Sequence, residues 1–202
     1  MSFLTPQPKI AILILAAGAS TRMGSPKQLL KWGESTLLNH RIEQAIKSKA
    51  DNVFVVLGAN YHKIKKTINQ KSVHILKNDE WEMGMGNSVA FGVKQILTLD
   101  FNAVLIMLVD QPLVNKSYLN DLMEACVLTN KPIVATSYPK GVGVPAIFTN
   151  VYFNQLAAIT GEKGAKELIK QHLENVTTIT PKTPIDDIDT KEAYNQLYNN
   201  NL

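Results

Sequence analysis

The sequence predicts a three-layer α/β fold in which helices cover both faces of a mostly parallel central sheet. Residues 10–15, 53–57 and 103–109 form short apolar runs without polar alternation, which is typical of strands buried on both faces. Helical patterns of apolar residues separate these runs. The resulting β-α-β-α order favours right-handed crossovers and places ligands at the carboxyl ends of the strands.

The helical patterns of the first half lie between the three apolar runs. They comprise Leu37, Leu38, Ile42, Ala45 and Ile46, then Ile64 and Ile68, then Val89, Val93, Ile96 and Leu97. Beyond Lys131 we expect shorter strands with mixed or antiparallel pairing near residues 133–135 and 145–148, joined by a glycine-rich turn. Helices near 151–158 and 165–173, a strand near 176–179 and a last helix from Thr190 towards Tyr198 complete the chain, with a frayed tail at 199–201.

Composition narrows the classes of function. With 202 residues and 45% hydrophobic content, we expect one globular domain over residues 1–202. The charge of +4 is spread without runs, which argues against a nucleic acid partner but suits an anionic small molecule. The single cysteine, Cys126, excludes an intrachain disulfide and a cysteine-rich zinc site, and we interpret it as a buried small hydrophobe. No bilayer-spanning run and no export signal in residues 1–8 stand out, so we expect a soluble, cytoplasmic protein without a membrane partner.

The most informative segment, residues 15–29, directly follows the first predicted strand. Its small residues, with Gly18 and Gly24, let backbone N–H groups approach a phosphate, while Arg22 and Lys27 supply positive charge. It is no P-loop, because Ser-Pro-Lys follows Gly24. We therefore predict a triphosphate cradle; the alternative is an ordinary glycine-rich turn with two solvated basic residues.

Acidic residues suggest a metal site. Asp110 follows a predicted buried strand, where a carboxylate faces the ligand crevice and suits Mg²⁺; the alternative is a turn cap. Asp187 and Asp189 are two residues apart, so both point to one side of an extended segment. Either can supply a second carboxylate, whereas Asp189 with Glu192 also fits a variant capping box.

A second loop, residues 84–88, precedes the third helical pattern. Gly84, Gly86, Asn87 and Ser88 place bare backbone and a helix N-terminus near an anion or a base edge. Ser88 equally fits a plain N-cap. Asn78, at the preceding strand end, either hydrogen-bonds the base or lies in a surface turn.

The string LAAGASTRMGSPKQLL, residues 15–30, resembles the signature of MobA-like NTP transferases, and more closely their molybdenum cofactor cytidylyltransferase branch. The resemblance continues through Asn78, Trp81, residues 84–89 (GMGNSV), Asp110-Gln111-Pro112 and the segments 143–148, 161–165 and 187–190. It implies a nucleotide-diphospho-sugar-transferase-like, Rossmann-like version of the predicted fold. Its nucleotide-binding half would be about residues 8–112, and its acceptor-binding half about 113–198.

The resemblance also implies roles for individual residues. Arg22 would grip the phosphates, Lys27 would stabilise the transferred phosphoryl group, and Asp110 would act with them in catalysis and bind Mg²⁺ together with Asp189. The implied nucleotide-binding residues are Leu15, Ala16, Ala17, Gly18, Ser20, Arg22, Lys27, Asn78, Gly84, Gly86, Asn87, Ser88 and Asp110.

The activity implied is Mg²⁺-dependent cytidylyl transfer from CTP to the molybdopterin cofactor, with release of pyrophosphate and a molybdenum hydroxylase as user of the product. Val144 stands where that branch carries histidine, and Lys191-Glu192 replace its Pro-Glu-Asp. A sugar or polyol phosphate is therefore the alternative acceptor. A non-catalytic accessory protein that delivers nucleotide or cofactor to a molybdoenzyme is the alternative of another class, disfavoured by the presence of Lys27 and Asp110. The preference for CTP over GTP and the oligomeric state stay open.

Overall fold

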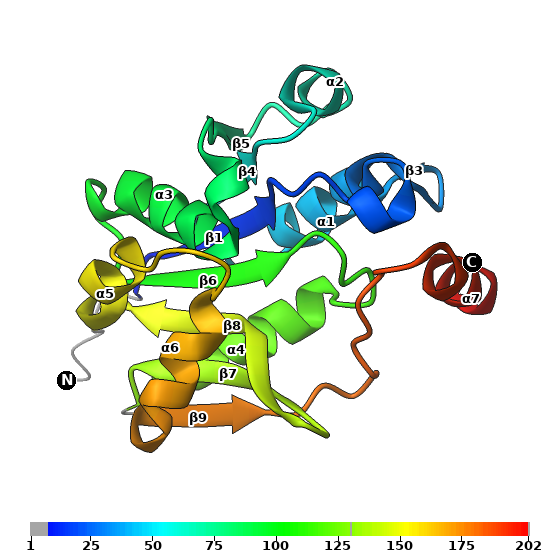
Figure 1. Cartoon of the computed structure of the whole chain (residues 1–202). Helices are drawn as coiled ribbons and strands as arrows, with labels where there is room; N and C mark the ends of the chain where they lie inside the picture. Colours follow the sequence, from blue (N-terminus) through cyan, green and yellow to red (C-terminus); the bar gives the residue numbers. More distant parts are fainter. Residues whose placement is uncertain (1–7, 130, 202) are drawn as a thin grey trace.

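The computed structural model describes residues 8–129 and 131–201. A seven-stranded sheet in the order β5-β4-β1-β6-β8-β7-β9 forms the centre, with helices on both faces (Figure 1). Its strands are β1 (Ile10–Ala16), β4 (Asn52–Leu57), β5 (Val73–Lys77), β6 (Ala103–Leu108), β7 (Ile133–Tyr138), β8 (Gly141–Thr149) and β9 (Val176–Ile179). The predicted three-layer α/β fold is confirmed.

The direction of the strands follows the apolar patterns. β1 pairs in parallel with β4 and β6, and β4 pairs in parallel with β5. All of β1 is buried, as expected for a parallel strand covered on both faces. β8 is antiparallel to β6 and to β7, whereas β9 is parallel to β7. The prediction of mixed pairing in the second half is thus confirmed.

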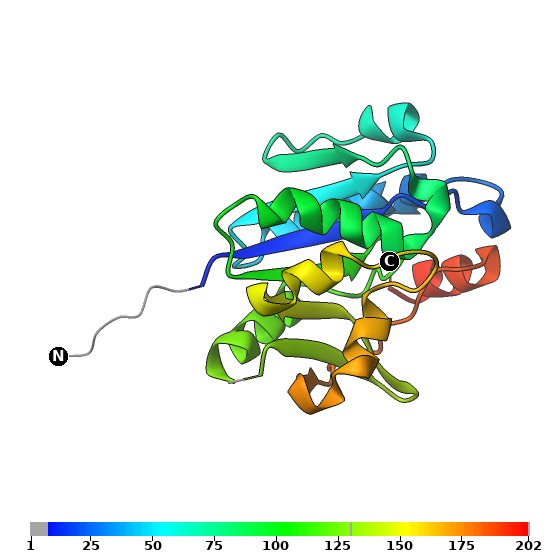
Figure 2. The same ribbon diagram turned by 60° about the vertical axis from the view of Figure 1, so that its left-hand side comes forward.

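Two helical layers cover the sheet. α1 (Leu37–Ile46) and α4 (Lys116–Leu128) lie on one face: α1 packs on β1 and β4, α4 packs on β7, β8 and β9, and Ile12 and Ile14 of β1 belong to the same core. α3 (Met85–Leu97), α5 (Phe153–Ala157) and α6 (Ala165–Gln171) lie on the other face: α3 packs on β1 and β4, α5 packs on α3, α6 packs on β8, and Leu13 and Leu15 belong to this second core (Figure 2). Alternation along a single strand therefore supplies both hydrophobic cores.

Several small elements differ from the predictions. The pair β2 (Lys31–Trp32) and β3 (Ser35–Thr36) forms an antiparallel hairpin that no pattern indicated. α2 (Tyr61–Lys65) ends before Ile68: the N–H groups of Thr67 and Ile68 donate to the carbonyls of Ile64 and Lys65, three residues back, and no longer four. Short 3-10 turns lie at Thr21–Met23, Lys27–Leu29, Trp81–Met83, Asn150–Tyr152 and Leu173–Asn175.

The C-terminal helix α7 (Lys191–Asn201) returns to the edge of the sheet at which β1 and β6 end (Figure 1). Thr190 caps it, since its Oγ1 accepts the N–H of Ala193 at 3.2 Å. The capping alternative for Asp189 is therefore wrong. The expected fraying at 199–201 is also wrong, because Asn201 remains helical and its amide donates to the Leu197 carbonyl at 2.8 Å.

Within residues 8–129 and 131–201, no helix combines the length and the apolar character that a membrane crossing requires. Residues 1–7, which belong to the segment searched for an export signal, lie outside the described part of the chain. Cys126, in α4, is partly buried and packs against the core, and burial raises the pKa of its thiol.

Candidate active site

A cavity of about 460 Å³ lies at the carboxyl ends of β1 and β6. The loop after β1 forms one wall, the start of α3 another, and the turn after β6 its floor. The lining residues are Leu15 to Met23, Lys27, Gln28, Trp81, Glu82, Gly84, Met85, Ser88, Leu108 to Asp110, Glu162 and Asp189. The predicted loop residues Leu15, Ala16, Ala17, Gly18, Ser20, Arg22 and Lys27 all line this cavity.

Buried hydrogen bonds hold the loop after β1 in shape. Gln28 is only 1% exposed, and its amide Nε2 donates to the carbonyls of Ala16 at 2.8 Å and Gly18 at 2.9 Å. Ser20 adopts a left-handed conformation with φ 57°, and its Oγ accepts the N–H of Lys27 at 3.1 Å. The loop is therefore fixed at both ends without any ligand.

Two features of this loop fit an anionic ligand. A Cβ atom at Gly18 would meet no protein atom within 4 Å, so protein packing does not require glycine there, whereas close approach of a ligand to the backbone would. The exposed side chain of Arg22 lines the cavity, and among the described residues it forms no ion pair. Its charge is thus available to a phosphate.

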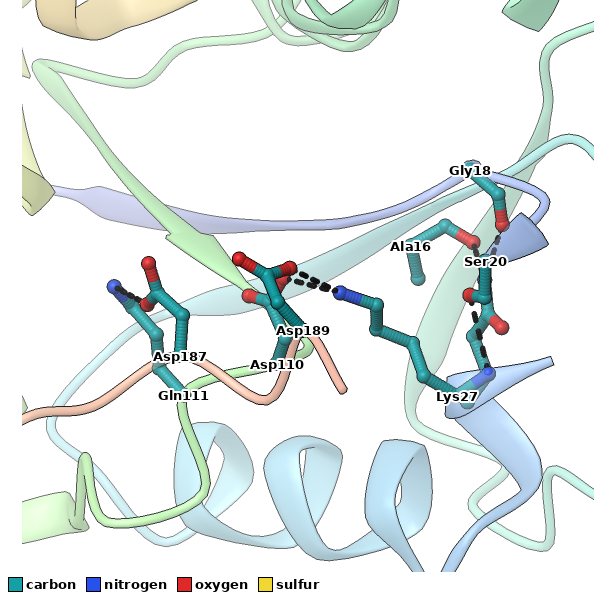
Figure 3. Close-up of polar contacts among 9 residues, drawn as sticks. Ala16, Gly18, Ser20, Lys27, Asp110, Gln111, Asp187 and Asp189 are labelled. Carbon is teal, nitrogen blue, oxygen red and sulfur yellow. Dashed lines mark hydrogen bonds and ion pairs between the residues drawn. The ribbon is translucent and has the colours of Figure 1, made fainter. Parts of the chain in front are cut away.

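Lys27 joins two carboxylates that are distant in sequence. Its Nζ donates to Oδ2 of Asp110 at 2.8 Å and to Oδ1 of Asp189 at 3.2 Å (Figure 3). Burial alone lowers the pKa of Lys27, but the attraction of Asp110 and Asp189 outweighs it and holds the pKa above 10.5. Lysine is therefore fully protonated in this cluster.

The carboxylates fit a hard divalent cation. Asp110 and Asp189 converge on one point, the Lys27 ammonium, and the Oδ1 of Asp110 is buried without a hydrogen-bond partner among the described residues. No cluster of three or more Asp, Glu, His or Cys side chains suited to a metal occurs in residues 8–129 and 131–201. A cation held here would need further oxygens from phosphates and water, which is the usual arrangement for Mg²⁺.

Asp187 lies apart from this pair. Its Oδ1 accepts a hydrogen bond from the amide of Gln111 at 3.0 Å, and both side chains lie away from Lys27 (Figure 3). Burial, together with the charge of Asp110, raises the pKa of Asp187. The backbone N–H of Ile188 donates to the Asp110 carbonyl at 2.8 Å, so the segment 187–189 is tied beside Asp110 and presents its two carboxylates to different cavities.

The loop before α3 is only partly in the first cavity. Gly84 and Ser88 line it, whereas Asn78, Gly86 and Asn87 do not. Asn78 is buried, and its amide binds Ser88 Oγ at 3.1 Å and the N–H of Glu80 at 3.0 Å. Ser88 lies inside α3, whose N-cap is Gly84, so the N-cap alternative for Ser88 is wrong.

A second cavity of about 630 Å³ adjoins the first. Leu15, Met85, Leu108 and Glu162 line both. The charged residues around the second cavity are Lys140, Lys163, Lys166, Lys170, Glu162, Glu167, Asp186 and Asp187. Tyr138 and Gln111 also line it, and the Gln111 amide lies within hydrogen-bond distance of the Tyr138 hydroxyl and the Val144 carbonyl, at 3.2 Å from each. The two cavities together can hold two substrates that meet near Asp110.

Arg41 is a residue near the site that sequence reasoning missed. It is fully buried in α1, and its Nη1 donates to the carbonyls of Pro112, at 3.2 Å, and Val114. Burial lowers the pKa of Arg41 to about 9, although the charge of Asp110 opposes this. Its position inside an otherwise ordinary helical pattern gave no signal of this contact.

Comparisons with known proteins give a matching family and similar relatives. The MobA-like NTP transferase domain family matches residues 12–176. Purine catabolism protein PucB of Bacillus subtilis is 28% identical, with 94% of this chain and 96% of that protein covered. Nicotine blue oxidoreductase of Paenarthrobacter nicotinovorans is also 28% identical, with 96% and 98% covered.

Solved structures share the fold over nearly the whole chain. The homolog of Mycobacterium tuberculosis rv0371c from Mycobacterium sp. strain JC1 is 27% identical, with a TM-score of 0.84 and 95% of this chain and 96% of that chain covered. Rv0371c of M. tuberculosis in complex with manganese is 24% identical, with a TM-score of 0.81 and 95% and 98% covered. The latter likeness bears on the fold alone.

Proposed function

Because the chain belongs to the MobA-like NTP transferase family and is a nucleotidyltransferase, we propose that it transfers CMP from CTP to the molybdopterin cofactor and releases pyrophosphate. The observation that most supports the chemistry is the convergence of Asp110 and Asp189 on Lys27. This cluster lies between a loop suited to a triphosphate and a second cavity suited to an acceptor.

In this proposal the triphosphate lies along the loop after β1. Ala17, Gly18 and Ser20, just beyond β1, would offer backbone N–H groups, whereas Leu15 and Ala16 are paired in the sheet. Arg22 offers a charge that is not already paired within the described residues. Such preorganised donors bind anionic oxygens without a reorganisation cost. Gly84 and Ser88, with Trp81, line the part of the cavity left for the base and ribose.

Asp110 and Asp189 would hold the divalent cation. Mg²⁺ is our first choice, and Mn²⁺ was bound in the mycobacterial protein of the same fold. Bound there, the cation would help to neutralise the negative charge of the phosphates during transfer. Asp187 would stay on the acceptor side, where Gln111 already orients it.

The reaction is a direct displacement. A phosphate oxygen of the acceptor attacks the α-phosphorus of CTP in line, a new P–O bond forms, and the bond between the α-phosphorus and the bridging oxygen to the β-phosphate breaks. Pyrophosphate leaves towards Arg22. Lys27, released from the carboxylates, donates to the oxygens of the α-phosphoryl group, where negative charge grows. Positioning and charge neutralisation then account for catalysis, and no covalent enzyme intermediate is needed.

The second cavity would hold the acceptor. Lys140, Lys163, Lys166 and Lys170 line it together with four carboxylates, and the lysines can bind the phosphate of the acceptor. Molybdopterin is proposed from the resemblance of the sequence motifs, and a molybdenum hydroxylase would use the product. The names of the two relatives, one in purine catabolism and one an oxidoreductase, point to no single acceptor.

Pyrophosphate release by the full chain tests the proposal. The assay combines Mg²⁺ and CTP or GTP with molybdopterin, with a sugar phosphate or with a polyol phosphate. We expect release with CTP and molybdopterin, and affinity for GTP lower by roughly 5-fold to 150-fold, the cost of an unpaired buried base edge. Release only with a sugar or polyol phosphate would support the alternative acceptor. Nucleotide binding without release under any condition would support the accessory protein instead.

A further inference from the structure

The turn at residues 161–164, between α5 and α6, is tied to the first turn of α3. The N–H of Gly86 donates to the Gly161 carbonyl at 2.7 Å. In return, the N–H of Gly161 donates to Oδ1 of Asn87 at 2.8 Å. Figure 2 shows the connection between α5 and α6 passing beside the start of α3. Two reciprocal hydrogen bonds therefore join segments that are far apart in sequence.

The glycines before and within α3 are required by this contact. Gly84 has φ 104°, and a Cβ atom there would lie 2.5 Å from the Gly161 carbonyl oxygen. A Cβ atom at Gly86 would lie 2.6 Å from the carbonyl oxygen of Lys163. Contacts this short with backbone exclude any side chain at either position. The close approach of the 161–164 turn accounts for both glycines without a nucleotide.

The turn contributes to the walls of both cavities. Glu162 lines the first and the second, whereas Lys163 and Gly164 line the second. On the other side of the contact, Gly84 and Met85 line the first cavity. The side chain of Asn87 reaches neither, since its oxygen binds Gly161 and it lines neither cavity.

We propose that Asn87 is a positioning residue that fixes the 161–164 turn, and with it part of the wall of the second cavity, instead of contacting the nucleotide. This inference rests on the proposed function only in taking the second cavity to bind the acceptor. The hydrogen bond from the Gly161 N–H to Asn87 and the close contacts of Gly84 and Gly86 with the turn define the role of Asn87 independently of any substrate.

Substitution of Asn87 separates the two roles. Asn87→Asp keeps an oxygen that accepts the Gly161 N–H, and a carboxylate near the start of α3 is also favourable. Asn87→Ala removes that acceptor. In Asn87→Ala we expect hydrogen exchange of the Gly161 amide, followed by NMR, to be about 2-fold to 10-fold faster, as for the loss of one hydrogen bond. In Asn87→Asp it should stay near wild type. Thr98→Ala, at the other end of α3, is the matched control.

Nucleotide binding and kinetics complete the test. Calorimetry with Mg-CTP should give Kd values within about threefold of wild type for Asn87→Ala, whereas loss of a direct contact would weaken binding roughly 5-fold or more. The KM for the acceptor should rise several-fold and the KM for CTP should not. Gly86→Ala, which displaces the turn without removing any side chain, should raise the same KM.

Unchanged Gly161 exchange in Asn87→Ala, or a loss of CTP affinity greater than threefold, would overturn the inference and return Asn87 to the nucleotide site. Failure of the proposed function is distinguishable, because the exchange and calorimetry require no acceptor. If wild type released no pyrophosphate with any acceptor, those two measurements would still decide the role of Asn87.

Discussion

The ammonium of Lys27 lies 2.8 Å from Oδ2 of Asp110, and the same nitrogen reaches Oδ1 of Asp189 at 3.2 Å. A single cation of the protein therefore keeps two carboxylates together that would otherwise repel. In the proposed mechanism, a divalent cation at these carboxylates would compete with the lysine for the same oxygens. Displaced from them, the lysine would become available to the transferred phosphoryl group. The ion pair would thus link cation binding to the proposed catalytic role of Lys27.

The first prediction concerns removal of this competition. Lys27→Met keeps the length of the side chain but removes its charge. Turnover should fall roughly 100-fold to 1000-fold, as for the loss of an oxyanion contact, while Mg-CTP affinity falls less. The nucleotide-free variant should bind Mn²⁺ more tightly than wild type, which calorimetry or electron paramagnetic resonance measures. Lys9→Met, which removes the exposed pair with Asp100, is the control; weaker Mn²⁺ binding in Lys27→Met would contradict the competition.

A second prediction uses the carboxylates. Asp189→Asn keeps the shape of the side chain but loses the negative charge that holds a hard cation. Turnover should collapse, and the Mg²⁺ concentration needed for activity should rise. The thermal midpoint should stay near wild type, because Thr190 caps α7 and Asp189 does not. Pyrophosphate release against Mg²⁺ concentration measures the effect.

Asp110→Asn calibrates the second prediction. Its effect should resemble that of Asp189→Asn, and the double variant should be less than additive if both carboxylates hold one ion. Thr190→Ala is the complementary control, since loss of an N-cap costs about 0.5–2 kcal/mol of helix stability and leaves both carboxylates in place. Near-wild-type turnover in Asp189→Asn would end the two-aspartate model and shift attention to Asp187.

A third prediction concerns pH and stability. Burial, aided by the nearby Arg41, lowers the pKa of His40 below 6.5, although the bond of its Nε2 to the Pro112 carbonyl opposes this. As the pH falls through 6.5, the unfolded chain takes up a proton before the folded protein does. Stability is therefore full above that pH and decreases below it, until the lower folded pKa is passed.

The measurement is urea unfolding at several pH values between about 8 and 5, within the range over which histidine titrates. His40→Gln should remove part of the acid-induced loss, at about 1.4 kcal/mol for each unit by which the folded and unfolded pKa values differ. His62→Gln, at an exposed position, serves as control. Equal acid sensitivity of wild type and His40→Gln would show that other groups cause the loss.

The sequence predicted features that depend on local pattern. Asp110 was assigned to a crevice because it follows an apolar run, and the run forms β6 at the centre of the sheet. The spacing of Asp187 and Asp189 predicted that both side chains point the same way. In the structure Asp187 binds Gln111, whereas Asp189 binds Lys27, so the two carboxylates point to different cavities. Contacts between distant segments decide that difference, and no local pattern records them.

The roles of small and buried residues show the same limit. From its neighbours in the sequence, Gly86 was expected to contact the nucleotide. In the structure, glycine is required there because the 161–164 turn lies too close to leave room for a side chain. Arg41 lies in an amphipathic helix, where an arginine is normally expected on the solvent side, and only the tertiary structure shows its bonds to the turn after Asp110. Both contacts join segments that are far apart in the sequence, so no local pattern predicts them.

The last prediction concerns Gln28, whose side chain holds the loop after β1, the proposed phosphate-binding loop, in its observed conformation. Its amide supplies hydrogen bonds to the carbonyls of Ala16 and Gly18, and it is almost fully buried. Gln28→Met keeps a side chain of similar length and removes both donors. The Ala16 carbonyl would be left unpaired in the interior, at a cost of about 1–3 kcal/mol, whereas the exposed Gly18 can bind water through its carbonyl. The free energy of unfolding should therefore decrease by about that amount.

Nucleotide affinity should decrease as well, because an ordered loop spares the ligand the cost of ordering it. We expect Mg-CTP binding to weaken by about tenfold or more, as measured by calorimetry at a temperature where the variant remains folded. Gln95→Met, at an exposed position in α3, controls for the new methionine. Lower stability with unchanged affinity would mean that Gln28 supports only the fold, and that the loop adopts its binding shape from the backbone of Ser20 and Lys27 alone.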